Sequence, residues 1–365
     1  MADLLVYGSY GYTGSLVVDE AVERGLDVLL AGRDRNAVEN QAIRQNCDER
    51  VFSLDERRLV DLALEEVEAV VHCAGPFEET ADPMVEGCLR TGTHYLDITG
   101  EIPVFERLAT RDGEAENAGI TVLPGAGFDV VPTDCLAAHL ADRLPDADRL
   151  SLGFQASGGM SRGTARTTVR NLGDGGAVRR DGRIESVPTA WRTRRIDFGD
   201  GERSAMTIPW GDVATAYHTT GIGSVEVYAA APRWAVTAAR FGRYLGPLAR
   251  SSVLKSLLES LVDARVEGPT EAERRESRNY VWGEVESGAG ERAVSRLVTP
   301  EAYRLTKRTA VEIAERVADG DAPEGFQTPA GAFGPDLILD VEGVERTDDP
   351  TEAVDTDETA VGTEP

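Results

Sequence analysis

The chain has 365 residues, of which 64 are acidic and 38 are basic, so its formal net charge is −26. Because 41% of the residues are hydrophobic, the chain can build real cores and is not a wholly disordered acidic polypeptide. The strong negative charge argues against nucleic acid as a partner, since binding to phosphates requires a basic surface.

A glycine-rich turn follows the first apolar segment of the chain. Residues 4–7 are typical of a buried strand, residues 8–14 are GSYGYTG, and a helical pattern then leads to a second strand at 26–31. This is the size of one βαβ unit, whose glycines let backbone N–H groups approach a dinucleotide pyrophosphate. We therefore expect the cofactor to be bound by Gly8, Ser9, Tyr10, Gly11, Tyr12, Thr13 and Gly14.

The residues after the second strand indicate which dinucleotide binds. An acidic residue at this place would accept hydrogen bonds from the ribose of NAD, whereas Arg33 can hold the 2′-phosphate of NADP. We therefore predict NADP (NADPH) as the cofactor. The neighbouring Asp34 keeps NAD as a less favoured alternative.

Strands and helices continue to alternate as far as about residue 130. Asp55, at the end of the third strand, is placed to reach the adenine. Ala74, Gly75 and Pro76 follow the fourth strand, where small residues let the backbone approach the nicotinamide ribose. The alternation predicts an α/β fold, with a Rossmann domain over 1–130 built on a doubly wound parallel sheet. Its further strands are expected at 50–54, 67–73, 94–98 and 120–123, and its further helices at 59–64, 84–90 and 102–118.

The pattern changes beyond residue 130. Asp181-Gly182 is a hairpin turn signal between two short strands. We expect a second, α+β domain over 131–325, with a mainly antiparallel sheet that forms one wall of a cleft. Its elements are predicted as a helix at 136–144, strands at 150–155, 192–198, 205–208 and 225–229, and a helix at 300–317.

Three arginines form a regular row in this second part. Arg162, Arg166 and Arg170 fall at i, i+4 and i+8, so a helix would carry them on one face. The stripe would suit phosphates of the cofactor, of coenzyme A or of a phosphopantetheine arm. The alternative is a solvated helix whose arginines pair with acidic neighbours.

One segment reverses the acidity of the chain. Residues 1–130 contain 26 acidic and 10 basic residues, whereas residues 233–261 contain one acidic and five basic residues among many apolar ones. We expect this segment to form two helices. Helices that combine basic and apolar residues are typical of contact with anionic lipid or with an acidic acyl carrier protein. Two ordinary core-packing helices are the alternative. The acidic tail at 347–365 has no apolar periodicity, and we expect it to be disordered.

The cysteine and lysine counts indicate the cellular location and the salt conditions in which the protein works. Cys47, Cys73, Cys88 and Cys135 show no zinc-ligand spacing, and neither a signal peptide nor a bilayer-spanning apolar run is visible. We expect a cytoplasmic protein without metal, with peripheral membrane contact left open. Only two basic residues are lysines, and with the strong acidity this favours a salt-adapted, halophilic protein. An ordinary acidic protein from a GC-rich genome is the alternative.

Several motifs are similar to those of the saccharopine dehydrogenase-like oxidoreductases. SRGTARTT at 161–168 and GFQTPAGAFGPDL at 325–337 resemble the trans-acting enoyl reductase branch, and the chain looks like a haloarchaeal-type acidic member. The resemblance implies an NADP-type Rossmann domain, an inserted second domain and a C-terminal return, which we place at 326–346. The superfamily motifs are GSYGYTG at 8–14, AGR at 31–33, AGPF at 74–77, HYLDITGE at 94–101 and PGAGFDVVPTD at 124–134.

Hydride transfer needs a placed substrate and a source of protons. Structural hydrogen bonding is the competing explanation for each candidate donor. Tyr303 and Lys307 have a YxxxK spacing, but they fall so late in the chain that we interpret them as part of an amphipathic helix. The candidate proton donors are Tyr95, Asp129, Tyr217 and His218.

The sequence thus predicts an NADP-dependent oxidoreductase that reduces a C=C bond of an acyl or lipid-like substrate. A saccharopine dehydrogenase-type C–N oxidoreductase is one alternative. Because such chemistry commonly uses a Lys/His acid–base pair, the scarcity of lysine counts against it. A non-catalytic NADP-binding Rossmann protein is the other alternative.

Overall fold

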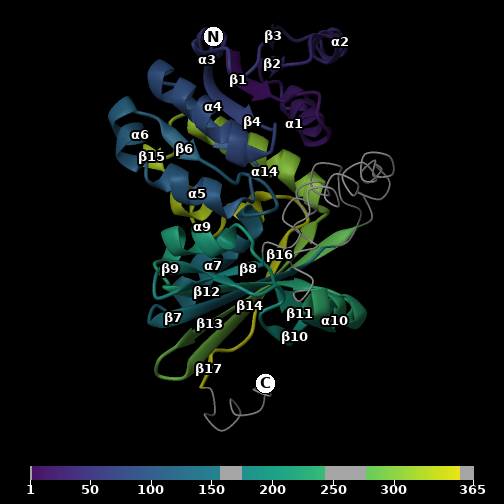
Figure 1. Ribbon diagram of the computed structural model, residues 1–365, viewed down its shortest axis with the longest axis vertical. Helices are drawn as coiled ribbons and strands as arrows, with labels where there is room; N and C mark the ends of the chain where they lie inside the picture. The colour runs from purple at the N-terminus through teal and green to yellow at the C-terminus, as the bar shows by residue number, and fades with distance from the viewer. Residues whose placement is uncertain (1, 157–174, 243–276, 354–365) are drawn as a thin grey trace.

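The computed structural model describes residues 2–156, 175–242 and 277–353, whose strands form two sheets (Figure 1). The first sheet is entirely parallel. Its strands are β1 (Ala2–Tyr7), β2 (Val28–Gly32), β3 (Glu49–Val51), β4 (Val67–His72), β5 (His94–Asp97), β6 (Thr121–Leu123) and β15 (Gly325–Phe326). They lie in the order β15-β6-β5-β4-β1-β2-β3, which is the strand order of a Rossmann fold with a seventh strand added. The predicted fold class is confirmed.

Helices cover both faces of this sheet, as a parallel sheet requires. They are α1 (Tyr12–Glu23), α2 (Arg35–Gln45), α3 (Arg57–Leu64), α4 (Phe77–Thr91), α5 (Ile102–Ala109), α6 (Asp112–Ala118) and α14 (Ala302–Ala318). Successive residues of β1 point to opposite faces, so Leu4 packs with the core under α1 and α14, whereas Leu5 packs with the core under α3 and α4. All five residues of β2 are buried. The helix expected at 102–118 is in fact the two helices α5 and α6.

The second sheet is mixed and mainly antiparallel. Of the strand pairs that this sheet forms within the described residues, only β7–β12 is parallel. The main path runs β10-β11-β12-β7-β13-β14-β16. Its strands are β7 (Ala147–Gln155), β8 (Gly176–Arg180), β9 (Arg183–Val187), β10 (Thr193–Asp197), β11 (Glu202–Thr207), β12 (Ser224–Ala230), β13 (Arg278–Ser287), β14 (Glu291–Pro300), β16 (Glu345–Asp348) and β17 (Glu352–Ala353).

Two helices lie between the sheets in Figure 1, α7 (Val131–Arg143) and α9 (Asp212–Thr220). The core that begins under α1 continues through α7 into the second sheet, so one hydrophobic cluster joins both parts of the molecule. The remaining elements are α10 (Arg233–Gly242), α15 (Pro329–Phe333) and the 3₁₀ helix η2 (Leu337–Asp340).

The second part of the chain differs from the sequence prediction at three places. Tyr217 and His218 lie in helix α9, which was not among the predicted elements. The β13–β14 hairpin, the longest of the sheet, was not predicted. Helix α14, assigned to the second domain, packs against α1 and the first sheet. The expected turn at Asp181-Gly182 does join β8 to β9, and both residues have positive φ, at 46° and 77°.

The C-terminal tail also differs from the prediction. Residues 347–353 were expected to be disordered, but Thr347 and Asp348 belong to β16 and pair with β14, and Glu352 pairs with it through β17. Backbone pairing with β14 makes this stretch a strand, although its side chains lack the apolar periodicity that would have predicted one. The predictions for 354–365, for Arg162, Arg166 and Arg170, and for 243–261 lie outside the described residues.

Candidate functional site

The glycine-rich turn at 8–14 lies at the carboxyl end of β1 and leads into α1. Gly8 has φ of 79°, and a Cβ there would lie 2.8 Å from the Cβ of Ala74. A Cβ on Gly14 would lie 2.2 Å from the carbonyl oxygen of Gly8. These two glycines therefore let the turn pack against its own helix and against the turn that follows β4. Gly11 is the N-cap of α1 and places no side chain over the first turn of the helix, which leaves room for a phosphate.

Arg33 and Asp34 play different parts at the end of β2. The Asp34 carboxylate accepts a hydrogen bond from Ala37 N at 3.1 Å and caps α2. Arg33 is exposed, and no carboxylate of the described residues forms an ion pair with it. The guanidinium is therefore free for a phosphate, whereas the carboxylate that would favour NAD is engaged in the helix cap.

The turn at 74–76 is held from behind by a buried network that the sequence did not reveal. The Thr80 hydroxyl donates to the carbonyl oxygens of Ala74 and Pro76 at 2.8 and 3.0 Å, and His72 Nε2 lies 3.0 Å from the same hydroxyl oxygen. Burial lowers the pKa of His72 to about 3, so this imidazole is neutral. Its role is to fix the turn.

The two turns and Arg33 meet the requirements of a dinucleotide site. The contact between Gly8 and Ala74 leaves no space for a larger residue in the turn, no side chain caps the start of α1 by a hydrogen bond, and Arg33 provides a free cation at the end of β2. Asp55 also lies at this edge, because its charge and that of Arg33 both act on the phenol of Tyr7. Burial, chiefly, raises the pKa of Tyr7 to about 12.

Residues 4–123 match the protein family described as the saccharopine dehydrogenase NADP binding domain. The chain carries a saccharopine dehydrogenase NADP-binding domain. Both the predicted cofactor, NADP, and the resemblance to this family are confirmed by the match. The NADP-binding domain contains both turns and Arg33.

Relatives and solved structures extend the comparison. A putative trans-acting enoyl reductase of Mycobacterium tuberculosis is 27% identical over 187 residues, which cover 47% of this chain and 44% of that protein. A lipid droplet localized protein of Caenorhabditis elegans is 28% identical over 147 residues, or 36% of this chain and 34% of that protein. The match therefore spans less than half of these relatives.

Apo saccharopine dehydrogenase (L-Glu forming) of Saccharomyces cerevisiae has the same fold. Its structure aligns with 96% of this chain and all of that chain, with a TM-score of 0.66 and 15% sequence identity. The alignment therefore covers the second sheet as well as the NADP-binding domain.

The four candidate proton donors do not lie together. Tyr95 is completely buried in the core under α4, and its hydroxyl donates to Asp97 Oδ2 at 2.7 Å. Asp97 also accepts from Thr99 N and Gly125 N, which ties β5 to the loop after β6. Tyr95 therefore belongs to a structural network, and we withdraw it as a proton donor because no substrate can reach its hydroxyl.

Asp129 lies at the carboxyl edge of the first sheet and is partly exposed. A Cβ on Gly100 would lie 3.1 Å from Asp129 Oδ2, so the carboxyl group rests on the backbone of the loop after β5. Burial raises the pKa of Asp129 to about 6, and no hydrogen bond to this carboxyl group is present within the described residues. Asp129 can therefore exchange a proton near neutral pH.

The surroundings of Asp129 connect it to the cofactor turns and to an aromatic wall. Glu101, next to Gly100, accepts hydrogen bonds from Phe77 N and Glu78 N at the start of α4, directly after the 74–76 turn. On the other side, Trp210 Nε1 donates to the Asp129 carbonyl at 2.8 Å. The Trp210 ring lies 4.8 Å from Phe154. Neither Glu101 nor Trp210 was singled out from the sequence.

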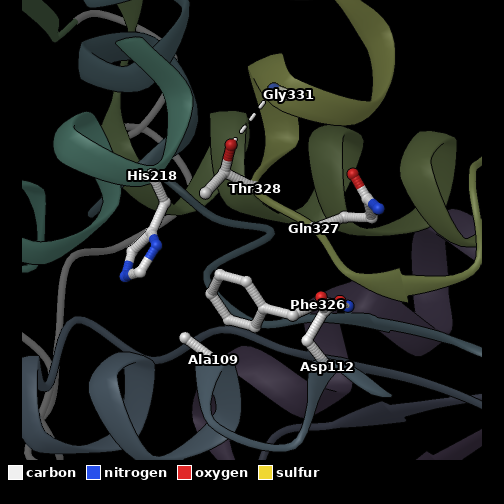
Figure 2. Close-up of a pocket in the computed structure, with 7 residues that line it drawn as sticks. All are labelled: Ala109, Asp112, His218, Phe326, Gln327, Thr328 and Gly331. Atoms are coloured by element: carbon white, nitrogen blue, oxygen red, sulfur yellow. Dashed lines mark hydrogen bonds between the residues drawn. The ribbon is translucent and has the colours of Figure 1, made fainter. Parts of the chain in front are cut away.

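Tyr217 and His218 lie at the far end of α9 from Asp129. Gly211, at the start of α9, is the end that approaches Gly100, and the six helical steps from Asp212 to His218 span about 9 Å. Figure 2 shows the His218 ring next to the Phe326 ring, and the two ring centroids are 5.2 Å apart. Both residues line a cavity of about 230 Å³. His218 Nε2 lies 3.4 Å from Glu106 Oε1, and Arg179 stacks over the Tyr217 ring. These two residues therefore bridge the two parts of the molecule.

Two further carboxyl groups are buried between α7 and α9. Asp134 accepts hydrogen bonds from the Thr219 hydroxyl at 2.5 Å and from Ala330 N at 2.8 Å. Asp212 is fully buried, and neither of its oxygens has a hydrogen-bond partner in the described parts of the chain. The hydroxyl of Thr133 is near but donates to a backbone carbonyl. Burial therefore raises the pKa of Asp212 well above its ordinary value.

The YxxxK pair has structural contacts. Lys307 Nζ lies 2.6 Å from Glu20 Oε2, which joins α14 to α1, and the Tyr303 ring meets the Tyr12 ring edge-on at 4.9 Å. These contacts agree with the interpretation of an amphipathic helix. No group of three or more His, Cys, Asp or Glu residues suited to a metal is found among the described residues, and none of their helices is long and apolar enough to cross a membrane.

Proposed function

We propose that the protein is an NADP-dependent oxidoreductase that reduces a C=C bond of an acyl or lipid-like substrate. The observation that carries the proposal is Asp129, a partly exposed acid with a pKa of about 6. It is linked through Gly100 and Glu101 to the cofactor turn at 74–76. The names of the relatives, a putative trans-acting enoyl reductase and a lipid droplet localized protein, support the substrate class.

Each part of the site has a role in this proposal. The two turns and Arg33 would hold NADPH by its phosphates and ribose, and NADPH supplies the hydride. Protonated Asp129 would deliver the proton that completes the reduction, so that the double bond gains one hydride and one proton. Trp210 and Phe154 would bound the apolar part of the substrate beside Asp129.

The best test is NADPH oxidation against enoyl thioesters, imino acids and prenyl lipids in high salt. We expect turnover of an enoyl or prenyl substrate, and Asp129→Asn should lower it by about 10²–10⁴-fold because a general acid is lost. Because the protonated form donates, the rate should fall as pH rises above about 6. Asp129→Asn should abolish this dependence without weakening NADPH binding.

His218→Gln is the matched control, since it changes another candidate donor, which lies at the other end of α9 from Asp129. It should retain the pH dependence. Unchanged turnover in Asp129→Asn would contradict the role of Asp129. Turnover of imino acids alone would favour the C–N alternative, and NADPH binding without any turnover would favour a non-catalytic NADP-binding protein.

The exposed side chains of helix α10 favour contact with a lipid surface over a purely internal role for the start of the 233–261 segment. Trp234 is 75% exposed, and the neighbouring Arg233 is exposed as well. An exposed tryptophan beside a cation suits the interface of an anionic bilayer. Sedimentation with anionic vesicles should decrease in Trp234→Ala, and equal sedimentation of both proteins would leave an acyl carrier or internal packing as the better explanation.

A further inference from the structure

Tyr10 reaches out of the glycine-rich turn and covers the end of β2. Its ring is partly exposed and lies so close to Gly32 that a Cβ there would be 2.4 Å from Tyr10 Cε1. The three atoms nearest to that position all belong to Tyr10. The closest contacts of a Cβ at Gly32 would therefore be with the tyrosine ring, which lies over the end of β2 next to Arg33, at the place where the 2′-phosphate would lie.

The Tyr10 hydroxyl also fixes the residue after Arg33. It accepts a hydrogen bond from Asp34 N at 3.3 Å, while the Asp34 carboxylate accepts from Ala37 N. Both polar groups that Asp34 could offer to a ribose are thus engaged within the protein. The carboxylate that would bind the 2′-hydroxyl of NAD is held in the helix cap.

A second contact makes the turn and α2 one unit. Gln41, on α2 and 2% exposed, donates from Nε2 to the Ser9 carbonyl at 3.0 Å. Ser9 and Tyr10, two successive residues of the turn, therefore each contact the segment that carries Arg33. The glycine-rich turn would hold the pyrophosphate, and the segment with Arg33 would hold the 2′-phosphate. These contacts fix the two segments relative to one another before the cofactor binds.

We propose that Tyr10 is a specificity-determining residue for NADP over NAD. Its ring, seated on Gly32, forms the wall against which Arg33 and the 2′-phosphate pack, and its hydroxyl keeps Asp34 turned into the cap of α2. Without the ring, Arg33 loses its support and Asp34 becomes free to accept a ribose hydroxyl. NADPH binding then weakens and NADH binding strengthens.

Because the closest contacts of a Cβ at Gly32 are with the Tyr10 ring, the two residues suit a double-mutant cycle. The dissociation constants of NADPH and NADH are measured by fluorescence titration for the full-length protein and for Tyr10→Ala, Gly32→Ala and the double variant. Each single variant should reduce the NADPH preference by about tenfold or more, the scale of a lost charge-assisted hydrogen bond. Gly32→Ala should have little further effect once Tyr10 is alanine, since the three atoms nearest to its Cβ are then removed.

Three results would overturn the proposal. One is an unchanged preference in Tyr10→Ala. Another is a change in NADPH preference on Gly32→Ala that is the same whether residue 10 is tyrosine or alanine, which would mean that the substitution acts by altering strand β2. The third is equal loss of both nucleotides in Tyr10→Ala, which would make Tyr10 a general support of the turn. If Gly32→Ala does not fold, as judged by thermal unfolding, the preference of Tyr10→Ala alone decides. These are binding measurements, so they do not depend on the proposed reaction.

Discussion

At the residue scale, single side chains divide into those that would meet the cofactor or substrate and those that hold them in place. The Arg33 guanidinium and the Asp129 carboxyl group have no hydrogen-bond or ion-pair partner in the described chain, whereas the side chains of Asp34, His72 and Glu101 are hydrogen-bonded within the protein. The free groups are the ones that the proposed chemistry requires. The bonded groups fix the turns on which the cofactor would rest.

Arg33 provides the most direct test at this scale. Arg33→Ala should weaken NADPH binding about 10- to 100-fold, because a charge-assisted contact with the 2′-phosphate is lost, and should leave NADH binding nearly unchanged. Titration calorimetry with both nucleotides measures this. The neighbouring Arg35→Ala is the control, since Arg35 is paired with Glu39 on α2. Equal binding of NADPH by Arg33→Ala would contradict the assignment.

The buried carboxyl group of Asp212 should make the stability of the folded protein depend on pH. Its folded pKa is raised above the unfolded value, so the native state holds the proton more tightly and stability falls as pH rises toward the folded pKa. Asp97, Asp129 and Asp134 have folded pKa values of about 6, so a fall in stability that continues above that pH separates the contribution of Asp212 from theirs. Asp212→Asn should flatten the part of the decrease in melting temperature that lies above about pH 6.

The exposed Asp321→Asn is the control for this measurement and should melt with the pH dependence of the natural protein. A slope in Asp212→Asn that matches the natural protein would mean that the buried carboxyl group remains protonated throughout or is solvated in solution.

At the element scale, the two parts of the molecule are joined by β8, α5 and α9. Arg179 of β8 is 3% exposed and donates to the carbonyls of Val213 and Gly182, both at 2.8 Å, and to Glu106 of α5 at 2.5 Å. A buried guanidinium with this many partners fixes the distance between α5 and α9. It thereby fixes how Trp210, just before α9, faces Asp129.

Arg179→Met should therefore destabilise the protein by about 2–4 kcal/mol, because buried carbonyls lose their donor while the volume is kept. Chemical denaturation measures the change. Arg180→Met is the matched control: its side chain is 37% exposed and paired with Glu185, and its loss should cost less than about 1 kcal/mol. Equal losses would show that Arg179 has no special role in joining the two parts.

Local patterns explain which elements could be predicted from the sequence. The glycine-rich turn, β4 and the Asp181-Gly182 hairpin each have a signal within a few residues. The β13–β14 hairpin was missed because its strands carry charged residues such as Glu284, which is buried but paired with Arg194 and Arg292. The roles of Glu101 and Trp210 depend on contacts between distant segments. No pattern within either segment could indicate them.

At the scale of the whole molecule, the net charge of −26 governs the response to salt. Repulsion among so many like charges opposes the compact state, and at 1 M salt the screening length is only about 3 Å. We expect the melting temperature to rise by several degrees between 0.1 and 2 M KCl. A melting temperature that is flat or falls with KCl would contradict the salt-adapted interpretation of the composition.

The seventh strand of the first sheet has a consequence for synthesis on the ribosome. β15 pairs with β6, yet roughly two hundred residues separate them in the chain, and α14, which covers one face, is also made late. At 5–20 residues per second, the nascent sheet waits on the order of 10–40 s with an open edge and with the face under α14 only partly covered. An unpaired edge is a template for aggregation, so the interval between β6 and β15 is the time at which this protein most needs a chaperone.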